Sequence, residues 1–460
     1  MEPVLVLNLV GLTPRLLKSG SMPRLEAYAA AQEERSILPS TPAVTCTAQA
    51  DMMMGVPPRE HGAVANGWFF RDLAEVWLWR QSCHLIADGG RLRSVFQRWK
   101  ERYPETTTAQ IFWWWNLPGF ADYCVTPRPT YWADGRKGPD IHTSPPSLRR
   151  ELQETLGDFP LFQFWGPGAG IASTRWIAEA TCHVLETQRP GLAMAYLPHL
   201  DYDLQRHGPD GPAAEAAAAA LDVEFERIHQ VAVSLGYRIV VVSEYGIEAV
   251  ERAVFPNRAL REAGLLEIHP ARNGSLLDPG NSRAFAVCDH QLAHVYVQDP
   301  ADLEEVRLLL AGLAGVESCI PRAEAKDLDH ANSGELILLA EPGAWFAYPY
   351  WAEGEPAPDF ASTVEIHRKP GYDPLELFLD PTKPLLKPRL ALKLLGKKLG
   401  FRTLMNVVPE DTSLVKGSHG RPPSSPEEGP VWIGPEELCP GDGSIPATEA
   451  LRRIAPDEGQ

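Results

Sequence analysis

The chain has few cysteines and no long apolar run. Its 460 residues include seven cysteines, an odd number, and no two of them form a CxxC pair. This pattern argues against a disulfide framework and a zinc ribbon, and it indicates free thiols in a reducing compartment. No stretch approaches the roughly 18 apolar residues of a membrane-spanning helix, so we expect no membrane partner.

The chain is also poor in positive charge. Its formal net charge of −17 would repel a phosphate backbone, which disfavours binding to long nucleic acid. A small phosphorylated substrate stays compatible with this charge, because a bound metal can dominate the local field. The N-terminal segment MEPVLVLNLVGL lacks the basic start and the small-residue cleavage site of a signal peptide. We therefore expect a cytoplasmic protein whose first apolar run is a buried strand.

Apolar runs of strand length alternate with helical patterns. The runs are VLVLNLV at 4–10, AQIFWWW at 109–115, LAMAYLP at 192–198 and RIVVVSE at 238–244, with helix-like stretches at 170–185 and 212–235. Continuous apolar runs are typical of strands buried on both faces, so the pattern predicts an α/β fold with a mainly parallel central sheet between helices. Ligands of such sheets bind at the carboxyl ends of the strands.

The sequence pattern changes near residue 256, where short strands such as AFAVCD and AHVYV precede a helix at 301–313. We predict a small α+β cap insertion at 256–350 within a hydrolytic core formed by 1–255 and 351–440. The late segment contains basic residues from Lys383 to Arg402 and acidic residues over 425–460. It is predicted to wrap irregularly around the core and to be disordered over 441–460.

The segment PAVTCTAQADMMMGVPPREHGAVANGW at 42–68 holds the first candidate site. A helix from Cys46 to Met54 would place Thr45 at its N-cap, where backbone N–H groups favour an anion. A threonine hydroxyl there becomes a nucleophile when a neighbour, usually a metal ion, lowers its pKa. Alternatively, Thr45 is simply a helix cap.

This segment resembles the nucleotide pyrophosphatase/phosphodiesterase branch of the alkaline phosphatase superfamily, in which a nucleophilic threonine opens a helix. The resemblance extends over about residues 4–434, through YLPHLDYDLQRHGP, VVVSEYG and the late KGSHGR. It implies a three-layer αβα fold of the alkaline phosphatase type. It also implies one or two divalent metal ions, either zinc or a harder metal such as manganese or iron.

For the first metal, Asp201 and His419 match the family's aspartate and late histidine in context, whereas a second histidine is replaced by Gln205. We assign Gln205 to substrate binding. His367, in the turn-rich EIHRKPGYDP, is a candidate replacement ligand. His199 and Asp203 are further oxygen or nitrogen donors nearby.

The second metal site departs further from the family pattern. Asn8 stands where the resemblance implies an aspartate, and Glu244 and Tyr245 replace an aspartate–histidine pair. These oxygen donors suit a harder metal better than zinc. The role of Thr45 as nucleophile therefore depends on whether Asn8, Glu244 and Tyr245 hold a metal.

Three other features are ambiguous. Asn66 is either a phosphate-binding amide, as the resemblance suggests, or part of an Asn-Gly turn. His290 and His294 are either a metal pair or packing residues of the insertion. The run Trp113–Trp115 is either a stacking surface for a base or a buried strand end.

Three hypotheses follow. The first is metal-dependent hydrolysis of a phosphodiester, a nucleotide pyrophosphate or a phosphonate through a covalent phospho-threonine on Thr45. The second is a catalytically degenerate scaffold that binds a phosphorylated ligand, suggested by Asn8, Gln205 and Tyr245. The third is a phosphomutase of the same superfamily, which differs in the acceptor of the phosphoryl group.

Overall fold

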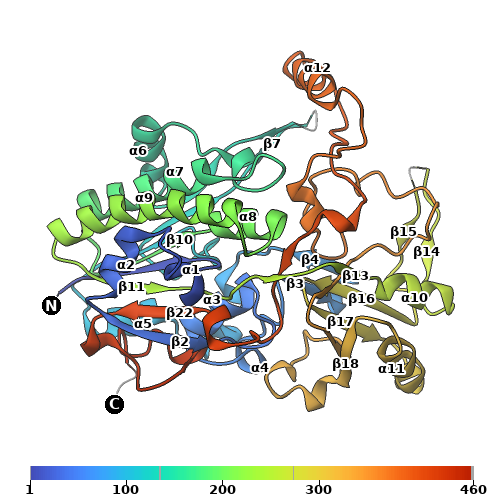
Figure 1. The fold of residues 1–460 in the computed structure, drawn as a ribbon, viewed down its shortest axis with the longest axis horizontal. Coiled ribbons are helices and arrows are strands. Elements are labelled where there is room, and N and C mark those ends of the chain that lie inside the picture. Colours follow the sequence, from blue (N-terminus) through green and yellow to red (C-terminus); the bar gives the residue numbers. More distant parts are fainter. Residues whose placement is uncertain (1, 134–135, 273, 457–460) are drawn as a thin grey trace.

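The computed structural model describes residues 2–133, 136–272 and 274–456. Its centre is a nine-stranded sheet in the order β23-β2-β22-β11-β1-β10-β5-β6-β9, in which β11, β1, β10, β5 and β6 run parallel (Figure 1). This arrangement confirms the predicted α/β fold with a mainly parallel sheet. The strands are β1 (Val4–Leu9), β2 (Glu33–Leu38), β5 (Thr108–Ile111), β6 (Tyr123–Pro127), β9 (Ile141–Ser144), β10 (Leu192–Leu197), β11 (Arg238–Val242), β22 (Val431–Gly434) and β23 (Ile445–Pro446).

Helices cover both faces of this sheet, as Figure 1 shows. In β1, Leu5 and Leu7 face a core shared with α6, α7 and α9, whereas Val4 and Val6 face a core shared with α3 and α5. The apolar run of β1 is continuous because both of its faces are buried. The helices are α1 (Pro14–Leu17), α2 (Pro23–Ala29), α3 (Thr45–Met54), α4 (Pro58–His61), α5 (Val95–Arg102), α6 (Pro146–Leu156), α7 (Ile171–Gln188), α8 (His199–His207) and α9 (Pro212–Ser234).

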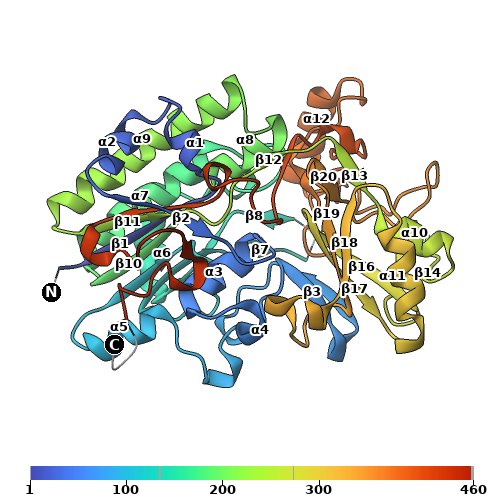
Figure 2. The ribbon, with the colours of Figure 1, turned by 60° about the horizontal axis from the view of Figure 1, so that its bottom comes forward.

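A second lobe, here called the cap, has its own apolar core and lies beside the sheet (Figure 2). Its antiparallel sheet has the order β16-β17-β19-β18, and it falls within the predicted insertion at 256–350. The cap elements are α10 (Pro256–Glu262), β16 (Ala284–Asp289), β17 (Leu292–Val297), α11 (Leu303–Ala311), β18 (Val316–Pro321) and β19 (Leu336–Ala340). Among the described residues, no helix is long and apolar enough to cross a membrane.

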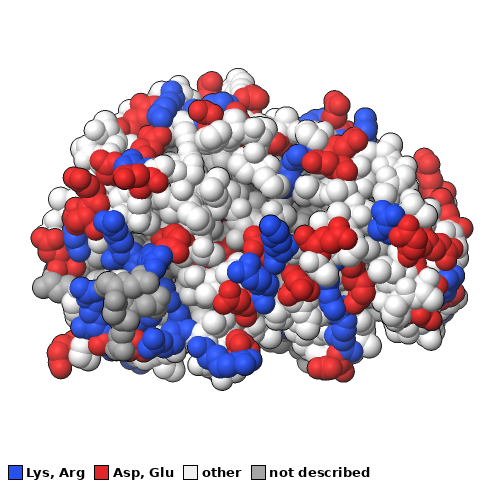
Figure 3. Space-filling view, turned by 90° about the horizontal axis from the view of Figure 1, so that it is seen from below, with Lys and Arg blue, Asp and Glu red and all other residues white. Residues whose placement is uncertain are grey.

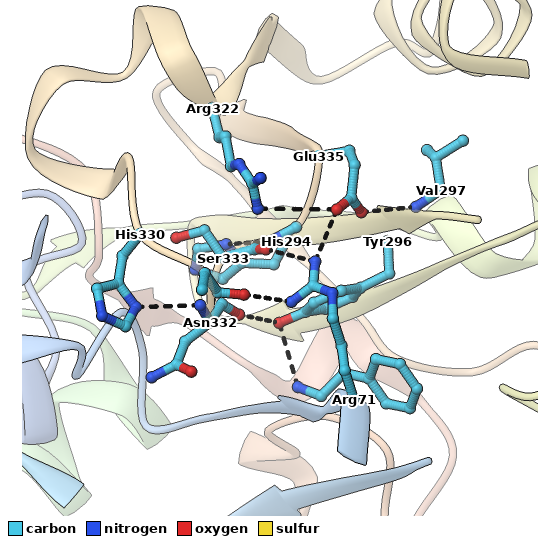
Figure 4. A network of polar contacts seen from close by, with 12 residues as sticks. Arg71, His294, Tyr296, Val297, Arg322, His330, Asn332, Ser333 and Glu335 are labelled. Carbon is cyan, nitrogen blue, oxygen red and sulfur yellow. Dashed lines mark hydrogen bonds and ion pairs between the residues drawn. The ribbon is translucent and has the colours of Figure 1, made fainter. Parts of the chain in front are cut away.

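A network of polar contacts, the cap anchor, joins the cap to the hairpin of β3 (Gly67–Phe70) and β4 (Glu75–Leu78) (Figure 4). Arg71 donates to Glu335 Oε1 at 2.7 Å, and its guanidinium lies 4.9 Å from the ring centre of Tyr296. His294 Nε2 lies 3.0 Å from the carbonyl of Val64, and its Nδ1 accepts from the backbone N–H of Gly334. The cap is therefore held to the core by an exposed ion pair and by the buried hydrogen bond of His294, as well as by apolar contact.

The structure differs from the expectation at two segments. The strand predicted at 109–115 ends at Ile111, because Phe112 and Trp115 have φ of 58° and 60° and turn the chain. Trp113 to Trp115 are buried.

Residues 441–456, predicted to be disordered, contribute β23, which pairs with β2. They also bury Leu451 and Ile454 against the sheet. The prediction of disorder is wrong for this segment because its apolar side chains pack on the sheet and tie the terminal segment down. Residues 457–460 lie outside the described residues.

Candidate active site

Three neighbouring strands deliver polar side chains to one edge of the central sheet. Strands β11, β1 and β10 are adjacent and parallel. Asn8 lies near the end of β1, Glu244 and Tyr245 follow β11, and Asp201 lies in α8, directly after β10. All four side chains are buried. The parallel topology therefore gathers them where ligands of such sheets bind.

Thr45 opens helix α3 at this edge. The N-cap is Val44, so Thr45 is the first helical residue and lies one position further into the helix than predicted. Its Oγ1 is 3.1 Å from the hydroxyl of Tyr245, which in turn donates to Asp201 Oδ1 at 3.2 Å. The hydroxyl of Tyr245 thus stands between the candidate nucleophile and a carboxylate.

Asp201 is held by a second chain of hydrogen bonds. Gln205 donates from Nε2 to Asp201 Oδ2 at 2.8 Å, and Tyr372 donates to Gln205 Oε1 at 2.9 Å. Burial raises the pKa of Asp201 to about 7, against the opposing effect of the hydrogen bonds from Tyr245 and Gln205. Gln205 therefore positions the carboxylate of Asp201.

His419 follows β21 (Gly417–Ser418) and completes the group. Its Nδ1 lies 2.7 Å from the carbonyl of Ala43 and must carry the proton, since a carbonyl only accepts. Its Nε2 faces Asp201 Oδ1 at 3.7 Å, and its ring stacks on Tyr245 with centres 3.6 Å apart. Burial lowers the pKa of His419 to about 3. The imidazole is thus neutral and turns a lone pair towards Asp201.

Asn8 and Glu244 form a pair of their own. Asn8 Nδ2 donates to Glu244 Oε1 at 2.6 Å, and Gln49 of α3 donates to the same oxygen. Burial raises the pKa of Glu244 to about 8, although these donors and Thr45 oppose the rise. Asn8 Oδ1 and Glu244 Oε2 are buried and have no hydrogen-bond partner within the described part of the chain.

Asn66 is fixed beside the start of α3. Its Oδ1 accepts from the backbone N–H of Cys46 at 3.0 Å. Its own backbone N–H and its Nδ2 donate to the two carboxylate oxygens of Asp289, at 2.7 and 3.1 Å. Asn66 is only 2% exposed, which distinguishes it from an ordinary surface turn.

The turn between β16 and β17, here called the cap tip, enters the site with Asp289 and His290. The ring of His290 lies 3.7 Å from that of His419 and 3.8 Å from that of Tyr372. Sequence reasoning did not identify Asp289 or Tyr372, and it left His290 undecided. The available signal was weak: Tyr372 lies in the same turn-rich segment as His367, and Asp289 precedes His290.

Replacing Asp289 with asparagine is expected to tighten the binding of inorganic phosphate about fivefold to tenfold. The Asp289 carboxylate competes for the donors of Asn66, and a charged acceptor binds about 1 kcal/mol more strongly than a neutral one. Calorimetric titration at pH 8 measures the effect, because burial raises the pKa of Asp289 to about 7 and the wild-type group is then ionised. Asp329→Asn, an exposed change on the cap, is the control. Equal phosphate affinity in all three proteins would contradict the competition.

The structure brings together most of the predicted site residues, but not His367. That side chain lies near the carbonyl of Leu78, the cations Arg80 and Lys137, and Glu365. The turn-rich segment instead contributes Tyr372. Asp203 pairs with Arg206 at 3.0 Å, and His199 is buried in α8.

A match over most of the sequence shows to which family the chain belongs. The model of the type I phosphodiesterase / nucleotide pyrophosphatase family matches residues 4–373. The chain belongs to this family. Its membership supports phosphoester hydrolysis as the class of reaction.

Solved structures share the fold at low sequence identity. Phosphonoacetate hydrolase from Sinorhizobium meliloti 1021, in complex with phosphonoformate, is 15% identical with a TM-score of 0.60, over 99% of this chain and 95% of that one. An inactive form of murine ectonucleotide pyrophosphatase / phosphodiesterase 5 with AMP is 10% identical with a TM-score of 0.58, over 99% and 94%. The human counterpart is 9% identical with a TM-score of 0.59, over 98% and 94%. These similarities confirm the alkaline phosphatase-like fold.

Members of the family typically depend on divalent metal ions. Within the described residues, no group of three or more His, Cys, Asp or Glu side chains could hold a metal. At the implied second metal site, Asn8 turns its amide nitrogen towards Glu244 Oε1, and Asn8 Oδ1 and Glu244 Oε2 have no hydrogen-bond partner among the described residues. A metal at this position stays a prediction.

Three mixed donors lie close together at Asp201. Asp201 Oδ1 lies 3.2 Å from the Tyr245 hydroxyl and 3.7 Å from His419 Nε2. Donors that share a cation at about 2.1 Å lie roughly 3.0 to 3.4 Å apart, so a small adjustment would suffice. The fixed tautomer of His419 is the orientation that metal-binding histidines adopt.

Proposed function

We propose that the protein hydrolyses a small phosphoester or phosphonate, with Thr45 as the nucleophile. The observation that carries the proposal is the position of Thr45 Oγ1, at the first turn of α3 and 3.1 Å from the Tyr245 hydroxyl. Asn66 lies beside the same helix start and offers two N–H donors. Phosphorylated ligands suit such donors, because the N-terminal end of a helix favours negative charge.

In the proposed reaction, Thr45 Oγ1 forms a bond to phosphorus while the leaving group departs, which gives a phospho-threonine. Glu244 is the acceptor for the Thr45 proton: it interacts with Thr45, and its raised pKa makes its ionised form, which predominates above about pH 8, a stronger base than an ordinary carboxylate. Asn66 holds a non-bridging oxygen once Asp289 has released its donors. The oxygen of a water molecule then bonds to phosphorus as the bond to Oγ1 breaks, and Glu244 returns its proton to Oγ1. The proton that this water releases balances the one that the leaving group takes from solvent.

Asp201, His419 and Tyr245 are the residues that would hold a cation. Zinc, manganese or iron there would neutralise charge on the phosphoryl oxygens. Tyr372, through Gln205, keeps the Asp201 carboxylate in place for this role.

His419→Ala is expected to lower phosphodiester turnover on the order of 100-fold, whereas His367→Ala is expected to leave it unchanged. Both changes remove one imidazole, but only His419 lies beside Asp201. The measurement is hydrolysis of a chromogenic phosphodiester after chelation and re-addition of zinc, manganese or iron. Wild-type protein that stays inactive with each metal would sink the hydrolase proposal.

A second candidate is a scaffold that binds a phosphorylated ligand without turnover. It is favoured by the hydrogen bonds within the site: Asn8 and Gln49 donate to Glu244, and Asp289 takes both donors of Asn66. Under this proposal, AMP or inorganic phosphate binds with measurable affinity, and no product forms with any of the three metals.

A further inference from the structure

One segment is positively charged, although the chain as a whole is negatively charged. Residues 381–409 lie between Asp380 and Glu410 and contain seven Lys and Arg residues and no Asp or Glu, although the net charge of the protein is −17. The same segment contains eight leucines. It forms α12 (Leu386–Lys398), where the sequence predicted an irregular wrap. Figure 1 shows α12 standing out from the body of the molecule.

Helix α12 has an inner and an outer apolar stripe. Leu386 and Leu390, four residues apart, pack against a small core that includes Val407. The outer stripe, Leu392, Leu395 and Leu399, has the spacing of one helix face, and these side chains are 69%, 53% and 68% exposed. The inner stripe attaches the helix to the protein, and the outer stripe meets solvent.

Exposed apolar side chains continue on both sides of the outer stripe. Leu385, Phe401 and Leu404 are 74%, 67% and 53% exposed. Arg402 donates to the carbonyl of Ala133 at 2.6 Å and so connects the helix to the hairpin of β7 (Thr130–Tyr131) and β8 (Lys137–Gly138).

The hairpin adds aromatic rings to this surface. Tyr131 and Trp132 are 58% and 46% exposed. Lys137 Nζ lies 5.5 Å from the Tyr131 ring centre, and the Arg136 guanidinium lies 5.1 Å from that of Trp132. Amphipathic rings beside cations are typical of the boundary between water and lipid headgroups.

The cations of α12 border this apolar surface. Arg389 and Lys398 are exposed on either flank of the outer stripe. Burial lowers the pKa of Lys393, and the neighbouring charges of Lys383 and Arg389 lower it further, so the cations repel one another. In contrast, the underside of the molecule intermingles charges of both signs (Figure 3). An anionic surface would relieve the repulsion around α12.

We propose that this surface, made of Leu392, Leu395, Leu399, Phe401 and Trp132, docks on an anionic lipid bilayer. A helix with exposed leucines, a phenylalanine and flanking cations lies in the headgroup region with its apolar face buried. Each nearby Lys or Arg strengthens attraction to anionic lipid, and an apolar stripe with a basic patch supplies the two contributions that stable attachment requires. The expectation of no membrane partner rested on spanning segments, and peripheral docking needs none.

The test is sedimentation of the full chain with vesicles of phosphatidylcholine, with and without 30% phosphatidylglycerol, a fraction of about one lipid in three chosen to give a negative surface. We expect binding to the anionic vesicles only, and a loss of at least about tenfold in partitioning at 0.5 M salt, where charges are screened within roughly 4 Å. The variant Leu392→Gln/Leu395→Gln is expected to lose binding at least about tenfold. Leu308→Gln is the matched control, because Leu308 is 59% exposed on α11 of the cap.

Three outcomes would overturn the proposal. They are absence of binding to anionic vesicles, equal binding to zwitterionic vesicles, and equal partitioning of the double variant and the wild type. A wild-type dimer that becomes monomeric in the double variant, without vesicle binding, would show that a second copy covers the surface instead. Thermal unfolding of each variant verifies that the fold is retained.

Discussion

Thr45→Ala is expected to reduce phosphodiester turnover by at least about 1,000-fold, the scale of losing a nucleophile. Thr45 is 4% exposed and its hydroxyl contacts Tyr245, so the change removes the attacking oxygen without opening a large cavity. The N-cap of α3 is Val44, and alanine at the first helical position preserves the helix. The measurement is single-turnover hydrolysis with the metal that best restores wild-type activity.

Thr45→Ser is the matched control, because it keeps the hydroxyl and removes only a methyl group. It is expected to retain turnover within about tenfold of the wild type, since the same oxygen remains in reach of phosphorus. Both variants are expected to bind inorganic phosphate, because the donors of Asn66 are unchanged. Turnover by Thr45→Ala at the wild-type rate would remove Thr45 from the reaction.

Lowering the pH from 7.5 to 4 is expected to reduce the free energy of unfolding of the wild-type protein by about 3 kcal/mol more than that of the His294→Gln variant. In the cap anchor, His294 donates to the carbonyl of Val64 and accepts from the N–H of Gly334, so only a neutral ring satisfies both contacts. Burial lowers the pKa of His294 to about 4, from 6.5. Nearby Arg71 lowers it further, and Glu335 opposes this.

The sign follows from proton binding. Because the folded pKa lies below the unfolded value, the unfolded chain binds more protons between pH 6.5 and 4, and stability falls as the pH falls through this window. Chemical denaturation at several pH values measures the difference, and His269→Gln, a change at an exposed histidine, serves as the control. Parallel stability curves for the wild type and His294→Gln would contradict the assignment.

The centre of the site could be predicted because it depends on parallel strands. Continuous apolar runs locate the ends of β1, β10 and β11, and the topology then brings Asn8, Asp201 and Glu244 together. Thr45 was located by the start of a helix and by the order of family motifs. Strand ends, sheet topology and motif order were therefore enough to predict where these residues lie, apart from a shift of one residue at the helix start.

The contribution of the cap could not be predicted in the same way. Asp289 and His290 reach the site only because the cap docks on the core, and docking depends on side chains distant in sequence, such as Arg71 and Glu335. For the same reason, the segment that contains His367 supplies Tyr372 instead. A turn-rich segment indicates a loop near a site, but not which of its side chains faces inward.

The cap tip has a consequence for ligand selection. Asp289 is tethered to the same chain as Asn66, so it acts as an intramolecular competitor at high effective concentration. A phosphoryl group that enters gains only the difference between the free energy of its own contacts with Asn66 and that of the contacts of the Asp289 carboxylate. A small free anion that engages Asn66 alone is therefore expected to bind weakly while Asp289 is in place. A ligand with further contacts beyond its phosphoryl group is expected to bind more tightly, so the cap tip would favour whole ligands over small free anions.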